Sequence, residues 1–144
     1  MSEWTRREMM QTTALGLGAL VAPSFASRLA GSGDDTIRVG VIGCGGRGTG
    51  AAWNALEADP SVRIVAMADL FEDRLESSHT NLVNEWAGRV AVAPEHRFTG
   101  FDAYERLLAI KEVDYVVLAT PPHFRPIHFQ AAVGAGKHVF MEKP

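Results

Sequence analysis

The 144-residue sequence contains one cysteine and no excess of positive charge. A single cysteine excludes an internal disulfide framework and any zinc site built from several cysteines. With 14 Lys and Arg against 17 Asp and Glu, the formal net charge of −3 argues against general nucleic-acid binding. No run reaches the roughly 20 apolar residues of a membrane-spanning helix, and the sequence has no internal repeats or low-complexity tracts. What remains is an ordinary globular composition, with 47% apolar and 22% charged residues.

The sequence begins with the features of an export signal. The pair Arg6-Arg7 precedes a mildly apolar stretch at 14–22, and small residues follow at the −3 and −1 positions of a cleavage site that ends at Ala26. This apolar stretch is too short to span a bilayer. The twin arginine and the glycine-diluted core resemble a twin-arginine translocation signal, although two methionines and a glutamine replace its usual apolar pair and lysine.

These features predict the domain organisation. We expect a signal peptide over residues 1–26, a linker over 27–36 and one domain over 37–144. Export by the twin-arginine route would place the protein in the periplasm. The alternative is a flexible N-terminal helix that carries two chance arginines.

Residues 37–144 alternate between apolar, β-branched segments and helix-forming segments. The predicted strands are 37–42, 62–68, a short strand near the end of 90–98, 115–119 and 138–141. The predicted helices are 51–58, 71–87, 103–110 with Asp102 as N-cap, and 126–135. Strands that are apolar throughout are buried on both faces, and alternation with helices implies parallel strands joined by crossovers. The sequence therefore predicts an α/β fold with a doubly wound, five-stranded parallel sheet.

A glycine loop, Gly43-Cys44-Gly45-Gly46-Arg47-Gly48, follows the first predicted strand and fits the pattern G-x-G-x-x-G. Asp69 ends the second strand 21 residues after Gly48, which is the spacing of the dinucleotide-binding fingerprint. In that fingerprint the first glycine allows a tight turn, the second lets a pyrophosphate approach the backbone, and the third lets the helix pack on the sheet. The helix N-terminus offers N–H groups and partial positive charge to phosphates.

The sequence therefore predicts a Rossmann unit that binds NAD. The residues predicted at the cofactor are Gly43, Cys44, Gly45, Gly46, Arg47, Gly48 and Asp69. The acidic side chain of Asp69 would bond the adenosine ribose hydroxyls and repel a 2′-phosphate, whereas Arg74 keeps NADP possible. Cys44 is expected to be a small packing residue, because the sequence identifies no base beside it. A glycine-rich turn that binds no ligand is the alternative.

Two further motifs carry a family resemblance. Ala119-Thr120-Pro121-Pro122-His123 ends the fourth predicted strand, and Ala135-Gly136-Lys137-His138-Val139 leads to Glu142-Lys143-Pro144. Together with the glycine loop, these motifs resemble the Gfo/Idh/MocA family, named for glucose–fructose oxidoreductase and inositol dehydrogenase. The resemblance covers residues 37–144. It implies an NAD(P)-binding half, followed in the family by a mostly antiparallel C-terminal substrate domain that this sequence does not include.

The resemblance also implies roles for individual residues. Lys143 would be catalytic, since the family places this lysine beside the nicotinamide and the substrate hydroxyl, where an ammonium stabilises a developing alkoxide. The further residues implied at the cofactor are Thr120, Pro121, His123 and Glu142. The loop after the fourth strand departs from the family pattern at two positions, because many members have Asn at position 122 and His at position 125, where Pro122 and Arg125 stand here.

No metal site is predicted. His123 and His128 are five residues apart, which is the wrong spacing for one face of a helix. For His123, capping a helix and facing the cofactor are both open. His128 and His138 are expected to be structural.

These inferences predict the NAD(P)-binding part of an exported oxidoreductase that transfers hydride to or from a sugar or polyol. The cofactor is expected to be tightly bound, because free NAD is a cytoplasmic metabolite. The resemblance implies that catalysis also needs an aspartate and histidine pair, or an equivalent, beyond Glu142-Lys143-Pro144. We therefore expect the chain alone to be truncated and inactive, and homo-oligomers to require the C-terminal domain. The alternatives are an NAD-dependent glycoside hydrolase of the same family and a non-catalytic nucleotide-binding module.

Overall fold

The computed structural model of the chain describes residues 35–143. The predicted signal peptide, and the predicted linker except for its last two residues, lie outside this described range. None of the helices within it is long and apolar enough to cross a membrane.

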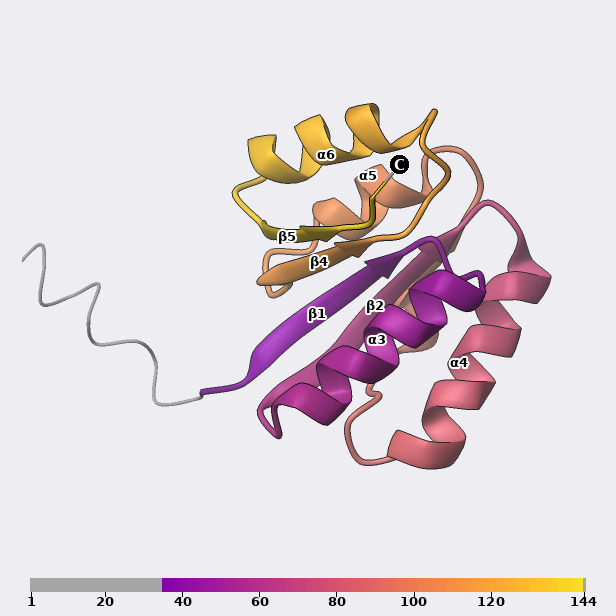
Figure 1. The fold of residues 1–144 in the computed structure, drawn as a ribbon, viewed down its shortest axis with the longest axis vertical. Helices are drawn as coiled ribbons and strands as arrows, with labels where there is room; N and C mark the ends of the chain where they lie inside the picture. Colours follow the sequence, from indigo (N-terminus) through magenta and orange to yellow (C-terminus); the bar gives the residue numbers. More distant parts are fainter. Residues whose placement is uncertain (1–34, 144) are drawn as a thin grey trace, which may run out of the picture. The chain divides into compact units, whose positions relative to one another are not determined.

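Five parallel strands form one sheet in the order β3-β2-β1-β4-β5 (Figure 1). The strands are β1 (Ile37–Ile42), β2 (Val62–Asp69), β3 (Arg97–Thr99), β4 (Tyr115–Leu118) and β5 (His138–Met141). The chain proceeds from β1 toward one edge of the sheet and returns to continue with β4 on the other side of β1. In open sheets of this kind, ligands bind outside the carboxyl ends of the strands at such a switch point. The predicted fold class is confirmed.

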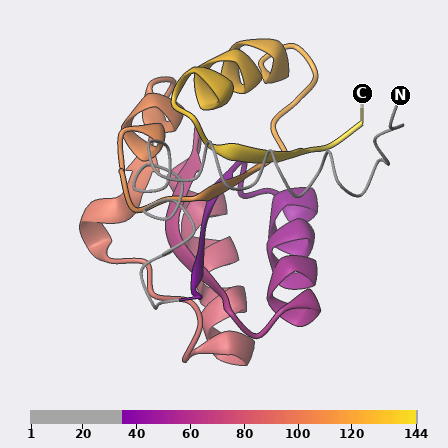
Figure 2. The same ribbon diagram turned by 90° about the vertical axis from the view of Figure 1, so that its left-hand side faces the viewer.

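Two helices cover each face of the sheet. The first pair, α3 (Gly46–Ala58) and α4 (Glu72–Trp86), packs on one face, and the second pair, α5 (Ala103–Leu108) and α6 (Arg125–Gly134), packs on the other (Figures 1 and 2). A short 3₁₀ turn, η1 (Pro94–His96), leads into β3. This two-sided cover follows from right-handed crossovers between parallel strands.

The core divides between the two faces because successive strand side chains point in opposite directions. On the face of α3 and α4, Val41 and Met67 pack with Leu56, Leu75 and Leu82 of the helices. All five side chains are fully buried.

Small strand residues let α5 approach the opposite face closely. Ala66 and Ala68 of β2 pack there with Leu107 of α5. Gly40 of β1 leaves room for the same leucine, since a Cβ at this position would lie 2.7 Å from Leu107 Cδ2. The close packing of α5 therefore depends on short side chains in the central strands.

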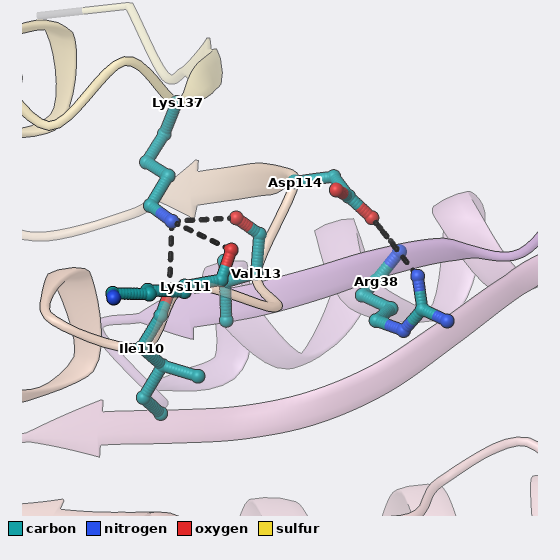
Figure 3. A network of polar contacts seen from close by, with 6 residues as sticks. All are labelled: Arg38, Ile110, Lys111, Val113, Asp114 and Lys137. Carbon is teal, nitrogen blue, oxygen red and sulfur yellow. Dashed lines mark hydrogen bonds and ion pairs between the residues drawn. The ribbon is translucent and has the colours of Figure 1, made fainter. Parts of the chain in front are cut away.

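Lys137 fastens the beginning of β5 to the turn after α5 (Figure 3). Its Nζ donates to the carbonyl oxygens of Ile110 and Val113 at 2.7 Å each, and to that of Lys111 at 3.4 Å. Carbonyl groups at and beyond a helix C-terminus lack intrahelical partners, and a lysine ammonium can satisfy several of them. The lysine of the Ala135–Val139 motif is therefore a structural residue at the end of the sheet opposite to the carboxyl ends of the strands.

Most predicted boundaries agree with the structure to within two residues, but the helix predicted at 51–58 begins at Gly46. Glycine has a low helix propensity, so the glycine-rich residues 46–50 do not predict the first turn of α3. Asp102 occupies the N-cap position of α5 as predicted, but its side chain makes no capping bond and instead accepts a hydrogen bond from Arg106 Nη2 at 3.2 Å.

Candidate functional site

A cavity of about 490 Å³ opens at the carboxyl ends of the strands. Its volume lies within the range of about 300–1,000 Å³ that is usual for ligand sites. The predicted site residues that line it come from four segments far apart in the sequence. They are Gly43, Gly45 and Arg47 of the glycine loop, Asp69 of β2, Thr120 and Pro121 after β4, and Glu142 and Lys143 after β5.

Two glycines of the loop are required by the protein itself. Gly43 has a φ of +94°, and a Cβ there would lie 2.8 Å from the carbonyl carbon of Ala119. Gly48 faces the same turn, and its Cβ would lie 1.7 Å from the carbonyl oxygen of Gly43. The turn and α3 therefore fit together only without side chains at Gly43 and Gly48.

Gly45 and Gly46 have open space where a side chain would be. Apart from chain neighbours and the helix's own backbone, no heavy atom of residues 35–143 lies within 4 Å of a Cβ built on either glycine. Gly45 is the N-cap of α3, which has no side-chain cap. The first N–H groups of a helix lack intrahelical partners. Open space next to free N–H donors suits a phosphate group.

The Asp69 carboxylate is oriented by two backbone donors at the end of β2. The N–H of Cys44 donates to Oδ2 at 2.6 Å, and the N–H of Phe71 donates to Oδ1 at 2.9 Å. Each carboxylate oxygen has two lone pairs, so both can accept a further hydrogen bond. Asp69 is thus held in place and still able to bind ligand hydroxyl groups.

Cys44 is only 2% exposed, and its Sγ lies 3.5 Å from the carbonyl oxygen of Ala68. Burial, assisted by the negative charge of Asp69, raises the pKa of the thiol well above its usual value. A thiol that stays protonated is a poor nucleophile. Its environment is that of a packing residue.

Arg47 connects the glycine loop to the segment after β5. Its guanidinium forms an ion pair with the Glu142 carboxylate. The hydrogen bond from Arg47 holds the pKa of Glu142 below its usual range. The pair joins two sides of the cavity.

Arg125 also reaches this segment, although the sequence marked it only as a departure from the family pattern. It is buried, and its guanidinium donates to the backbone carbonyl oxygens of Thr120, Glu142 and Lys143. The segments after β4 and β5 are therefore bonded to one side chain.

The structure places His123 and His128 in different surroundings. His123 is exposed, its ring meets Phe124 edge-on with centroids 5.2 Å apart, and it does not line the cavity. His128, expected to be structural, does line the cavity, and its Nδ1 lies 3.1 Å from Thr120 Oγ1. Within residues 35–143, no three His, Cys, Asp or Glu side chains are grouped as metal ligands.

Sequence reasoning missed an apolar side of the cavity. Leu70 and Phe71 follow β2, Phe101 follows β3, and Tyr104 and Phe124 complete this side. Phe101 is 74% exposed and Phe71 is 50% exposed, so this side presents several apolar side chains to solvent together. Their position after predicted strands could have identified these residues, because residues just past the carboxyl ends of parallel strands border the ligand.

The buried His128 predicts a pH dependence of stability. Burial lowers the pKa of His128 below its ordinary value of 6.5. As the pH falls, the unfolded chain therefore takes up the proton before the folded chain does. The free energy of unfolding should be highest above that ordinary value and should decline as the pH falls toward the depressed pKa. Urea denaturation between neutral and mildly acidic pH measures the decline.

A His128→Gln substitution should make this decline smaller. Part of it should persist, because burial also lowers the pKa of His79. An unchanged decline in His128→Gln would contradict the role of His128.

The parallel sheet, the glycine turn at the switch point and the acid at the end of β2 define a Rossmann-type nucleotide-binding domain. Residues 37–144 match the family model GFO_IDH_MocA, described as "Oxidoreductase family, NAD-binding Rossmann fold". The chain belongs to this family, and the resemblance drawn from the glycine loop and from Glu142-Lys143-Pro144 is confirmed.

Curated relatives carry a second enzyme name. A glycosyl hydrolase family 109 protein of Solibacter usitatus (strain Ellin6076) is 34% identical over 151 residues, covering 100% of this chain and 34% of the relative. A glycosyl hydrolase family 109 protein of Streptomyces niveus is 40% identical over 116 residues, covering 76% of this chain and 21% of the relative.

Two solved structures with the same fold contain nicotinamide cofactors. KijD10, a 3-ketoreductase from Actinomadura kijaniata in complex with NADP, shares 34% identity with a TM-score of 0.55, over 76% of this chain and 30% of that chain. Scyllo-inositol dehydrogenase from Lactobacillus casei, with bound NAD(H) and scyllo-inositol, shares 25% identity with a TM-score of 0.59, over 76% of this chain and 28% of that chain. The chain thus spans about a third or less of the length of these proteins.

Proposed function

We propose that residues 37–144 are the NAD(P)-binding part of an exported oxidoreductase that acts on a sugar or polyol by hydride transfer with a tightly bound cofactor. The observation that carries this proposal is the cavity shared by the glycine loop, Asp69, Thr120 and Lys143. The similarity to a scyllo-inositol dehydrogenase and to a ketoreductase supports the substrate class.

The residues of the cavity fit a dinucleotide. The open space at Gly45 and Gly46, with the N–H groups that begin α3, would take the pyrophosphate. Asp69 would accept hydrogen bonds from the adenosine ribose. Thr120 and Pro121 would line the nicotinamide side.

Lys143 would act on the substrate hydroxyl. NAD(P), when bound, supplies the acceptor for a hydride from the substrate carbon. The substrate hydroxyl gives up its proton as the hydride leaves carbon, and the Lys143 side chain would stabilise the negative charge that the departing proton leaves on the oxygen and take part in that proton transfer.

Replacing Lys143 tests the proposed function. In the full-length protein, Lys143→Met is expected to lower kcat for sugar or polyol oxidation by about 10²–10⁴-fold, the usual contribution of acid–base catalysis. Nucleotide affinity should change little, because the glycine loop and Asp69 remain. The absorbance of reduced nicotinamide across a panel of sugars and polyols measures kcat. Lys111→Met, in the turn after α5, is the control and should retain full activity.

The 144-residue chain by itself should bind nucleotide without turnover. The share of each relative that the chain spans supports this expectation. Oxidation of a sugar by the purified chain at an ordinary enzymic rate would contradict it.

A glycoside hydrolase is the second candidate, and the names of the curated relatives favour it. Such an enzyme would oxidise and re-reduce its substrate within one cycle, so it would release an aglycone without net NADH. An oxidoreductase would instead consume one sugar or polyol and produce its oxidised or reduced partner. Assays of aglycone release and of net NADH on the same preparation separate the two. Bound NAD with neither activity would indicate a non-catalytic nucleotide-binding module.

We also infer export to the periplasm by the twin-arginine route, from residues 1–26, which lie outside the described range. This route carries folded proteins, so the cofactor can be loaded before export. A reporter fused to the signal should be exported, and the double substitution Arg6→Lys, Arg7→Lys should retain it in the cytoplasm. Native mass spectrometry of the exported full-length protein should find NAD(P) bound, and recovery of only the apo form would count against tight binding.

Asp69 predicts the choice between NAD and NADP. Asp69→Ser removes the negative charge that opposes a 2′-phosphate, and Arg74, which lines the same cavity, can then pair with that phosphate. The ratio of NADP to NAD affinity should rise by about 10–100-fold, as expected for relief of a like-charge contact. Calorimetric titration of the chain measures both affinities. Asp73→Ser, an acid of α4 that does not line this cavity, should leave the ratio unchanged.

A further inference from the structure

The Arg125 side chain bonds to the two segments that the proposed reaction needs together. Its Nε and Nη2 donate to the carbonyl oxygen of Thr120 at 3.1 and 2.7 Å. Its Nη1 donates to the carbonyl oxygens of Glu142 and Lys143 at 2.6 Å each. Arg125 begins α6 and is only 8% exposed, so the helix and its surroundings hold the guanidinium firmly.

The bonded carbonyls of Glu142 and Lys143 lie beyond the end of the sheet. The N–H of Glu142 donates to the carbonyl oxygen of Leu118 at 3.1 Å, and Leu118 and Met141 are the last paired residues of β4 and β5. Past this point, Arg125 bonds the main chain of the segment, and Arg47 bonds the side chain of Glu142. The backbone position of Lys143 is therefore set by Arg125.

A guanidinium suits this task. It presents five N–H donors in a rigid planar fork and remains charged under all ordinary conditions. A buried charge is costly unless its donors are satisfied, and here the partners are main-chain carbonyls on both segments. A cation bonded in this way fixes the relative positions of the groups it contacts.

We propose that Arg125 is a positioning residue for Lys143. Its fork sets the spacing between the Thr120 segment, on the nicotinamide side of the cavity, and the lysine that would act on the substrate. This inference rests on the proposed function of Lys143. It gives a role to the arginine that stands where many family members have histidine.

The proposal predicts a selective loss of the chemical step. In the full-length protein, Arg125→Ala should lower kcat by about 10–100-fold, the effect of misplacing a reacting group by roughly 1 Å. The KM for nucleotide should change little. Guanidinium ion added to Arg125→Ala should restore part of kcat, because the small planar cation can occupy the emptied fork. Arg125→Lys should remain impaired, since an ammonium is a point donor rather than a fork.

A second measurement uses the 144-residue chain and needs no turnover. The chain has three lysines, Lys111, Lys137 and Lys143, so reductive ¹³C-methylation gives an uncrowded NMR spectrum. Addition of NAD should shift the Lys143 signal, whereas Lys111 and Lys137, at the beginnings of β4 and β5, serve as internal references. In Arg125→Ala, the NAD-dependent shift of Lys143 should be lost or greatly reduced.

Arg89→Ala is the matched control. Arg89 also donates to main-chain carbonyls, those of Leu56 and Asp59, but it does not line the cavity. This variant should lower stability while the kcat and the Lys143 signal stay as in the unaltered protein. If Arg125→Ala does not fold, Arg125→Lys gives the same test, because it keeps a cation at the site.

Two outcomes separate the inference from the proposed function. If Lys143→Met loses activity while the Arg125 variants keep both kcat and the Lys143 signal, the positioning role is overturned and the proposed function stands. If Lys143→Met keeps full activity, the proposed function fails, and the positioning role fails with it.

Discussion

Gly48→Ala is expected to destabilise the chain by about 3 kcal/mol or more, because overpacking in a rigid site costs typically 1–3 kcal/mol and more where backbone must move. The added Cβ would lie 1.7 Å from the carbonyl oxygen of Gly43 and 3.3 Å from the Cβ of Ala119. The nearer neighbour is the backbone of the turn itself, which cannot move away without separating β1 from α3. A loss of this size is a large part of the roughly 5–15 kcal/mol that stabilises a domain. Urea denaturation of the chain measures it.

Gly50→Ala is the matched control for this substitution. Gly50 lies two residues further along α3, and a Cβ there meets nothing within 4 Å beyond its own helix and chain neighbours. Alanine in a helix interior is favoured over glycine by roughly 0.5–1 kcal/mol, so this variant should be slightly more stable than the unaltered chain. Equal stability of the two variants would contradict the packing account of Gly48.

Gly45→Val should lose nucleotide affinity by about 100-fold or more while the chain stays folded, since a steric conflict of about 2–3 kcal/mol corresponds to that factor. The protein leaves open space at this Cβ position, so the new side chain conflicts with a bound pyrophosphate and not with the fold. Calorimetric titration with NAD measures the affinity, and thermal denaturation checks the fold.

The Gly50→Ala variant again serves for comparison, because it should bind NAD as the unaltered chain does. Tight NAD binding by Gly45→Val would show that the pyrophosphate does not approach the loop at Gly45. A parallel loss of stability in Gly45→Val would show that the open space is used by the fold.

The fold was predictable because its signals are local. Apolar runs such as 37–42 and 115–119 and the turn residues between them determine which segments become strands. The start of α3 was not predictable in this way. Gly46 and Gly48 have low helix propensity, and the helix begins here because Gly48 packs closely against the turn at Gly43, which is a tertiary effect.

The candidate site was predictable where the chemistry depends on residue type at a fixed spacing. The glycine loop and Asp69 are of this kind, and both border the cavity. The interactions of Arg125 were not predictable, because its partners are main-chain carbonyls that every residue possesses. The same is true of His128, whose approach to Thr120 depends on how α6 packs. Only the three-dimensional arrangement identifies such contacts.

The segment that carries Lys143 is attached in two physically different ways. Arg125 of α6 bonds main-chain carbonyls past the end of β5, and Lys137 bonds main-chain carbonyls at the start of this strand. Arg47, which is 62% exposed, instead pairs with the acidic side chain of Glu142. Dissolved salt screens exposed ion pairs, with a Debye length of about 8 Å at physiological ionic strength, and acts much less on short bonds that are buried. Raising the ionic strength should therefore loosen the link to the glycine loop while the lysine stays where the carbonyl contacts hold it. The glycine-loop side of the cavity and the position of Lys143 would then respond separately to the ionic medium.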